Sequence, residues 1–174
     1  MTQKRKYRNK PVYWDTEKRR TVSRAKAEAK KTHGQFRFPK NVLRFASTLE
    51  FNVYLELCRM YGADNIQCQY PVPVANPGYL FPKGRTWRVD FAISAIKDSD
   101  NITHLVEAKG LWLPEFTYTL ALFEQKAPNE FLKLRIVMGT EIPTERRVVA
   151  SLYDSNFKNN LLVYEDLKQL RHLP

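Results

Sequence analysis

The chain has few of the residues that build metal-binding or disulfide-rich proteins. Its 174 residues include two cysteines, Cys58 and Cys68, and three histidines, His33, His104 and His172. Their positions do not form the paired spacing of a structural zinc site, and two thiols are too few for a disulfide framework. We therefore expect reduced thiols in the core of a cytoplasmic protein.

Long apolar runs are absent as well. No stretch reaches the roughly 18 apolar residues that a spanning helix needs, and the basic first residues are not followed by an apolar segment. We expect neither a membrane span nor a secretory signal, and no membrane partner. Hydrophobic residues still make up 43% of the chain, which is enough for the core of one globular domain.

Acidic residues are scarce at the start of the chain. Residues 1–46 contain fifteen Lys and Arg but only three acids, so this segment accounts for the whole net charge of +11. Such a segment suits a polyanion, because each phosphate that it neutralises releases condensed counterions. A solvated tail is the alternative, whereas the apolar face of a membrane-surface helix is missing. The residues that we expect to contact nucleic acid are Arg5, Lys6, Arg8, Lys10, Arg19, Arg20, Arg24, Lys26 and Lys30, together with Arg88, for which an ion pair is the alternative.

Apolar periodicity predicts little regular structure before residue 47 and a regular series of elements after it. We expect residues 1–10 to be disordered without a partner, 21–31 to form a marginal helix, and 11–14 to pin the segment or to stack on a base. The later pattern predicts an α/β domain with a mixed central β-sheet flanked by helices. The predicted helices cover 47–61, 114–126 and 144–153, and the predicted strands cover 66–75, 85–93, 104–109, 132–138 and 161–164. We expect prolines to place strand 66–75 at an edge or to bend it, and His104 to be a core or edge residue. The expected buried stripe of helix 114–126 is Phe116, Leu120 and Phe123.

The segment His104-Leu-Val-Glu-Ala-Lys-Gly-Leu-Trp112 carries an acid and a base two positions apart in an apolar strand. Alternate residues of a strand point to the same face, so Glu107 and Lys109 would project side by side. An ordinary ion pair on a half-exposed strand is the simplest interpretation of these two residues alone. Charges on an apolar strand are costly to bury unless they are paired, metal-bound or catalytic, and the residues upstream favour a catalytic site.

Two more acids stand where such a site would use them. Asp90 is the lone acid in the middle of strand 85–93, and hairpin pairing with strand 104–109 would bring it near Glu107. Glu50 follows Ser47 in a capping-box pattern and also faces the packed side of its helix. Three carboxylates and a lysine at one end of a sheet suit Mg²⁺ or Mn²⁺, which prefer oxygen ligands. The face of the strand opposite Asp90 is expected to carry Trp87, Val89, Phe91 and Ile93.

This order of residues resembles the PD-(D/E)XK nuclease superfamily over residues 47 to about 138. The helix start Ser47-Thr-Leu-Glu50 and the run Glu107-Ala-Lys-Gly-Leu-Trp112 are similar to those of small phage junction-resolving endonucleases in that superfamily, which also carry a basic N-terminal extension. The chain departs from the pattern in two places. Val89 replaces the proline before the aspartate, and the loop between Asp90 and Glu107 is longer than in the phage resolvases.

The resemblance implies a restriction-endonuclease-like PD-(D/E)XK core at 47–174 behind a basic N-terminal arm at 1–46. It implies that Asp90 and Glu107 ligate the metal together with the backbone carbonyl of Ala108. Glu50 would serve a second metal position or its water shell, and Lys109 would activate the attacking water.

These residues predict a metal-dependent DNA endonuclease that acts as a homodimer without a small-molecule organic cofactor. By resemblance the substrate is branched or junction DNA, and the enzyme is cytoplasmic or phage-encoded and active in the host cytoplasm. A site-specific homing, restriction-like or transposon-end-cutting endonuclease is the alternative. A further alternative is a non-catalytic nucleic-acid-binding protein with a nuclease-like core.

Overall fold

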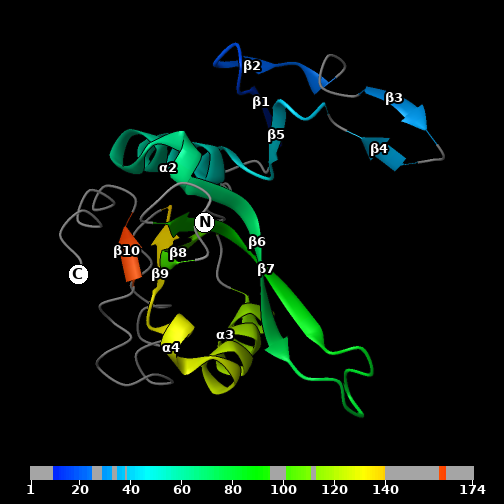
Figure 1. Ribbon diagram of the computed structural model, residues 1–174, viewed down its shortest axis with the longest axis vertical. Coiled ribbons are helices and arrows are strands. Elements are labelled where there is room, and N and C mark those ends of the chain that lie inside the picture. Colours follow the sequence, from blue (N-terminus) through cyan, green and yellow to red (C-terminus); the bar gives the residue numbers. More distant parts are fainter. Residues whose placement is uncertain are drawn as a thin grey trace, which may run out of the picture. The chain divides into compact units, whose positions relative to one another are not determined.

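The structure of the chain is a computed structural model, in which the chain divides into two compact units (Figure 1). The units are Met1–Asn52 and Val53–Pro174. Several predictions lie outside the described residues, namely the helix over 144–153, most of the loop before residue 101, and the pair Leu111 and Trp112. The described residues are 10–24, 29–32, 35–37, 39–94, 101–110, 113–139 and 161–163.

The N-terminal unit is built on a three-stranded antiparallel sheet of order β2-β1-β5. The helix predicted over 21–31 does not extend over the whole segment, because its two ends belong to β2 and β3. Arg24 is helical, and residues 25–28 lie outside the described residues. At the two ends, antiparallel partner strands supply the backbone hydrogen bonds. The strands are β1 (Val12–Asp15), β2 (Arg20–Val22) and β5 (Val42–Phe45), with a separate antiparallel pair of β3 (Ala29–Thr32) and β4 (Gln35–Arg37).

The apolar residues of β1 and β5 pack within this unit. The ring centroid of Trp14 lies 5.2 Å from that of Phe51, and the Phe45 ring lies 5.4 Å from the same residue. Tyr13 and Phe45 are buried. Residues 13 and 14 thus pack within the N-terminal unit, and the stacking of residues 11–14 on a base stays a prediction.

Helix α2 (Thr48–Tyr61) begins with the predicted capping box. Ser47 Oγ accepts the N–H of Glu50 at 3.1 Å, and Glu50 Oε2 accepts the N–H of Ala46 at 2.7 Å. The first bond satisfies a backbone donor of the first helical turn, and the second joins Glu50 to the residue that precedes the N-cap. Gly62, at φ 83°, follows the last residue of the helix, as a glycine at this position commonly does.

The C-terminal unit is organised around a mixed sheet with strand order β10-β9-β8-β7-β6. Neighbours β6, β7 and β8 are antiparallel, whereas β8, β9 and β10 run parallel. The predicted mixed sheet is confirmed, and so is the prediction that the proline-containing β6 lies at an edge, where a missing N–H donor costs no ladder bond. The strands are β6 (Ile66–Ala75), β7 (Arg85–Ser94), β8 (Ile102–Lys109), β9 (Leu134–Met138) and β10 (Leu161–Val163).

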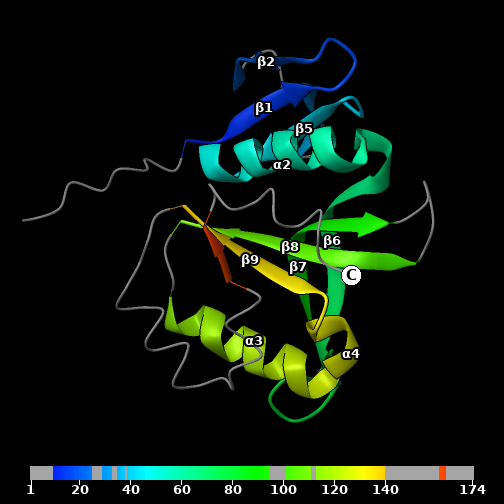
Figure 2. The same cartoon turned by 90° about the vertical axis from the view of Figure 1, so that its left-hand side faces the viewer.

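Helices lie against both faces of this sheet. Figure 2 shows α3 (Pro114–Lys126) along one face, where Phe116, Leu120 and Phe123 join the buried core, as the sequence predicted. A short helix, α4 (Pro128–Phe131), follows at once. On the other face, Tyr54 of α2 stacks on Phe91 with centroids 6.1 Å apart. The predicted class, an α/β fold with a mixed sheet and flanking helices, is confirmed at this level.

Strand β7 does not keep the strict alternation that its sequence predicts. Trp87 contacts the rings of Phe116 and Phe123, and Val89 belongs to the same cluster under α3. Phe91, two residues later, instead stacks on Tyr54 of α2. The expectation that all four odd-numbered residues share one face is therefore wrong, and the change of face falls at Asp90.

Candidate active site

Asp90 lies at the end of the β7–β8 ladder. The β7–β8 register ends at the pair Phe91↔Val106, so Asp90 has no strand partner on that side. On the other side, the β6–β7 register continues from Tyr70↔Val89 to Cys68↔Phe91, which leaves Gln69 opposite Asp90. Gln69 takes a positive φ of 55°, which is uncommon for a residue other than glycine.

Side chains replace the missing backbone bonds at this point. The N–H of Asp90 donates to Glu107 Oε2 at 3.1 Å, and the N–H of Ala108 donates to Asp90 Oδ2 at 2.9 Å. The side chain of Gln69 donates to Asp90 Oδ1 at 3.3 Å. The two strands are thus joined through their carboxylates, which brings Asp90 and Glu107 together as the sequence predicted.

Lys109 completes the cluster from the same strand as Glu107. Its ammonium forms an ion pair with Glu107 Oε1, which confirms that these two residues project from one face of β8. The Lys109 Nζ also lies 4.3 Å from the centroid of the Phe116 ring on α3. The Lys109 side chain keeps 26% of its surface exposed, against 3% for Glu107, so the lysine is the member of this pair that solvent or substrate can reach.

The pKa values of both carboxylates in this cluster are raised, chiefly by burial. Burial, followed by the nearby charge of Asp90, raises the pKa of Glu107 to about 8, although the Lys109 ammonium acts in the opposite direction. Burial also raises the pKa of Asp90, against the hydrogen bond from Ala108 and the charge of Lys109. Paired carboxylates with raised pKa values are typical of sites that bind a cation or carry out acid–base chemistry.

Glu50 was predicted to join this cluster, and that remains a prediction. Its carboxylate is buried and caps α2 through the N–H of Ala46. It belongs to the N-terminal unit, whereas Asp90, Glu107 and Lys109 belong to the C-terminal unit. Within the part of the chain that the structure describes, no three or more His, Cys, Asp or Glu side chains form a group that could hold a metal ion.

Two contributors to the cluster were not predicted from the sequence. Gln69 appeared only as a residue of an edge strand, and nothing in its neighbourhood marks it as a partner of Asp90. Phe116 was predicted as part of the buried stripe of α3 but not as the ring beneath Lys109. His104, expected to be a core or edge residue, is buried, and burial lowers its pKa.

The structure describes only some of the residues that are predicted to contact nucleic acid. Lys10, Arg19, Arg20 and Arg24 are exposed in the N-terminal unit. Arg88 is exposed on β7, and its guanidinium lies 3.4 Å from the Gln69 carbonyl oxygen. Among the described residues it forms no ion pair, which was its alternative role. The residues that lie outside the described part of the chain, or whose side chains do, are Arg5, Lys6, Arg8, Lys26 and Lys30.

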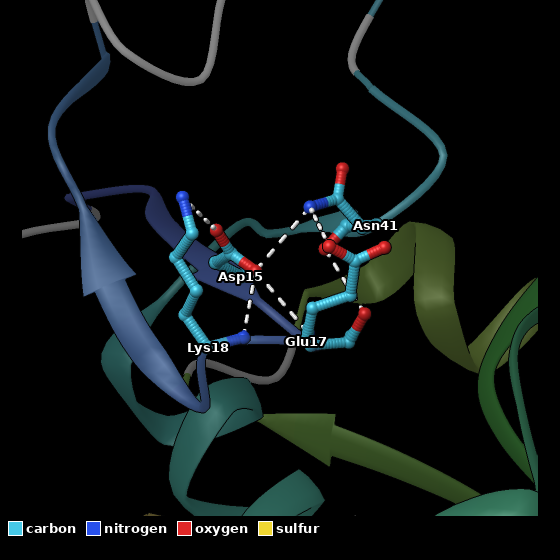
Figure 3. Close-up of polar contacts among 5 residues, drawn as sticks. Asp15, Glu17, Lys18 and Asn41 are labelled. Atoms are coloured by element: carbon cyan, nitrogen blue, oxygen red, sulfur yellow. Dashed lines mark hydrogen bonds and ion pairs between the residues drawn. The ribbon is translucent and has the colours of Figure 1, made fainter.

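A buried carboxylate shapes the basic turn between β1 and β2 (Figure 3). Asp15 Oδ1 accepts the N–H of Lys18 at 3.0 Å, the N–H of Glu17 at 3.2 Å and the side-chain amide of Asn41 at 3.3 Å. The hydrogen bond from Lys18 is the main reason that the pKa of Asp15 is lowered. These hydrogen bonds hold the conformation of the turn, which carries the exposed residues Lys18, Arg19 and Arg20. Arg19 lies in the left-handed region of backbone conformation, at φ 48°.

Comparisons with known proteins identify no relative. Neither the family models, nor the curated proteins, nor the solved structures gave a match to this chain. Among the described residues, no helix is both long enough and apolar enough to cross a membrane. The interpretation of the site therefore rests on its own geometry and on the sequence resemblance.

Proposed function

We propose that this chain is a metal-dependent DNA endonuclease that hydrolyses phosphodiester bonds by attack of a metal-activated water. The observation that carries the proposal is the meeting of Asp90 and Glu107 at the end of the β7–β8 ladder, with Lys109 paired to Glu107. The strongly basic N-terminal segment supplies attraction for a polyanionic substrate.

The donor set fits a hard divalent cation. Each carboxylate oxygen of Asp90 and Glu107 has one partner among the described residues, and such an oxygen has two lone pairs. Their mutual repulsion, expressed in the raised pKa of Glu107, would be relieved by a positive ion. We propose that Asp90, Glu107 and the backbone carbonyl of Ala108 hold Mg²⁺ or Mn²⁺, which favour oxygen ligands.

The residues around the proposed metal site would have separate roles in the reaction. A bound divalent ion supplies Lewis-acid polarisation of the phosphodiester and lowers the pKa of a water. Lys109, partly exposed and held between Glu107 and Phe116, is placed to orient the attacking water and to stabilise negative charge on the phosphate. Gln69 and the N–H of Ala108 fix the direction of the Asp90 carboxylate.

The order of elements supports a PD-(D/E)XK core. Helix α2, the antiparallel strands β6, β7 and β8, helix α3 and the strand β9 follow one another as the resemblance implies. Glu50, on the first turn of α2, is retained as a third carboxylate of the proposal. A homodimer and a branched DNA substrate are proposed on the resemblance alone, and a specific duplex site is the alternative substrate.

A cleavage assay tests the proposal. Supercoiled plasmid, linear duplex and a four-way junction are incubated with the full chain in Mg²⁺ or in chelator. We expect cleavage of at least one DNA in Mg²⁺ and none in chelator. The Lys109→Ala variant should cut about a hundredfold more slowly or worse, as for the loss of one group that stabilises the transition state. Lys133→Ala is the matched control, because it also removes one lysine of the same unit but leaves the cluster of Asp90, Glu107 and Lys109 intact. Lys133 forms only a long ion pair with Glu130 of α4, at 4.0 Å.

The outcomes separate the alternatives. DNA that is bound but cut under none of these conditions would favour the non-catalytic nucleic-acid-binding protein. Mg²⁺-dependent cleavage that is equally fast in Lys109→Ala and Lys133→Ala would leave the activity in place but refute the assignment of Lys109.

A further inference from the structure

The loop between β6 and β7 exposes two large apolar side chains. Tyr79 is 98% exposed and Leu80 is 80% exposed, the highest values among the large hydrophobic residues that the structure describes. They are neighbours in sequence, so they form one small apolar tip rather than two scattered surface residues. Figure 1 shows the β6–β7 hairpin leading to this tip as a two-stranded ribbon.

The exposure does not reflect a loose loop. The carbonyl oxygen of Phe81 accepts two hydrogen bonds, from the N–H of Gly78 at 2.9 Å and from the N–H of Gly84 at 2.8 Å. Each of these bonds closes one turn of the loop. Gly84 has φ +71°, and a Cβ there would lie 2.8 Å from the Ala75 carbonyl oxygen, so only glycine fits where the strands meet. The loop is therefore held in the form that presents Tyr79 and Leu80.

The base of the tip is fastened to the rest of the unit. The guanidinium of Arg85 lies 5.6 Å from the centroid of the Phe81 ring, and its Nη2 lies 3.4 Å from Thr119 Oγ1 on α3. Arg85 also begins β7, the strand that carries Asp90. The tip and the candidate active site are thus parts of one continuous hairpin.

The spacing along β7 relates the tip to the cleavage site. Five residue steps lead from Asp90 to Arg85, which is about 17 Å of extended strand at roughly 3.4 Å per residue. Successive bases along one strand of a duplex are also about 3.4 Å apart, so the base of the loop that carries the tip would meet DNA roughly five base pairs from the scissile phosphate.

The chemistry of the tip favours nucleic acid over a protein partner. Residues 76–85 include Lys83 and Arg85 but no acid, so the loop is basic as well as apolar. Two side chains offer roughly 400 Å² of contact at most, well below the about 800 Å² that each partner buries in a stable protein interface. An aromatic residue beside an aliphatic one is sufficient, however, to stack on a base and part a base step.

We propose that Tyr79 and Leu80 form a DNA wedge that inserts between bases close to the cleavage site. This inference rests on the proposed function and goes beyond it, because it assigns a binding element that unstacks DNA. Tyr79 stacks on an exposed base face, Leu80 occupies the opened step, and Lys83 contacts the adjacent phosphate. The wedge would favour DNA whose bases are already unpaired or poorly stacked, since the unstacking cost is lower there.

The test uses the full chain carrying Lys109→Ala in the presence of chelator, so that the DNA stays intact. The probes are a 30-base-pair duplex and a four-way junction, each with 2-aminopurine placed at successive positions.

We expect binding to raise the fluorescence at one or two positions. Changing Tyr79 and Leu80 together to Ala should remove this rise and weaken binding about tenfold or more. Tyr79→Phe should retain the rise, because its ring still stacks. Tyr118→Ala, at a 70% exposed tyrosine on α3, is the matched control.

Four outcomes decide the inference. Loss of the fluorescence rise in the double variant but not in Tyr118→Ala supports it. Tight binding with unchanged fluorescence and affinity in the double variant overturns the wedge and leaves the proposed function standing. A change of oligomeric state in the double variant, with DNA binding unaltered, makes the tip a protein contact and overturns the wedge. Failure of every variant to bind either DNA overturns the wedge and the proposed function together.

Discussion

Asp15 in the N-terminal unit and the Asp90–Glu107 pair in the C-terminal unit are inward-facing carboxylates whose pKa values move in opposite directions. Asp15 is surrounded by donors from Glu17, Lys18 and Asn41, and its pKa is lowered. Asp90 and Glu107 lie against each other, and the pKa of both is raised.

The difference distinguishes an acid that stabilises a turn from two acids for which we propose a metal-binding role. The donors around Asp15 come from its own turn and from Asn41, so they favour the charged form and hold the β1–β2 turn. The β7–β8 register, continued by one pair beyond Phe91↔Val106, sets Asp90 opposite Glu107, so the strand pairing itself brings the two acids together. A protein gains no stability from placing two acids together in a buried position, so a binding or catalytic role is the better physical explanation for Asp90 and Glu107.

The largest expected difference is in catalysis. Asp90→Asn should lower the rate of Mg²⁺-dependent DNA cleavage about a hundredfold or more, because it removes one anionic metal ligand. Asp15→Asn should leave the rate within about threefold, since an amide oxygen can still accept the N–H of Lys18. Nicking of supercoiled plasmid measures both. Equal losses of cleavage rate in the two variants would contradict a catalytic role that belongs to Asp90 and not to Asp15.

The pH dependence of stability should differ next. Glu107 binds its proton more tightly in the folded than in the unfolded chain, so its contribution to the free energy of unfolding falls as pH rises from about 4.5 to about 8. The metal-free Glu107→Gln variant should therefore gain stability relative to the parent over that range, by at most about 1.4 kcal/mol per pKa unit.

Urea unfolding at pH 5 and pH 8.5 measures this effect. Asp15 provides the opposite case, because its lowered pKa gives stability that is present above 3.8 and lost as pH falls through the folded value. A Glu107→Gln difference that is the same at both pH values would mean that Glu107 is charged and well solvated in the folded protein.

The sequence predicted those features that depend on local pattern. Helix α3 and strand β6 have their predicted bounds, because Pro114 marks a helix start and alternation marks the strand. Glu107 and Lys109 share a face because a strand repeats every two residues. The break at Asp90 was not predictable in this way. It depends on where the β7–β8 ladder ends and on the backbone of Gln69, which are properties of paired strands rather than of one segment.

The N-terminal unit shows the same limit. Alanine and lysine between 21 and 31 have good helix propensity, yet β2 and β3 occupy the ends of that segment. Propensity is a weak term that pairing with a distant strand overrides. The capping box of Ser47 and Glu50 was predicted correctly, because both of its hydrogen bonds lie within five residues.

A smaller effect concerns the turn that Asp15 holds. Asp15→Ala should lower the melting temperature by roughly 2–5 °C, because the N–H groups of Glu17 and Lys18 lose their acceptor. Glu17→Ala is the control, since its only described side-chain bond is a 3.4 Å contact with Asn41. Differential scanning calorimetry measures both variants. A melting temperature of Asp15→Ala equal to that of the parent would show that the turn does not depend on this carboxylate.

The smallest expected effect is on the salt dependence of DNA binding. Changing Arg19 and Arg20 to Ala should reduce the slope of log K against log salt by about 0.9 for each phosphate that the variant no longer neutralises. A double change of Lys126 and Lys133 to Ala in the C-terminal unit alters the net charge equally and should leave the slope closer to that of the parent. Equal slopes in both double variants would mean that the basic turn acts only through its total charge.

Binding of Mn²⁺, followed by electron paramagnetic resonance of the free ion, tests the assignment of Asp90 and Glu107 most directly. The parent chain and Asp15→Asn should both remove Mn²⁺ from solution with the same affinity. Asp90→Asn and Glu107→Gln should each bind it at least about tenfold more weakly, because each loses a charged ligand. Equal affinity in all four chains, or no binding by the parent, would contradict a metal site at the β7–β8 junction.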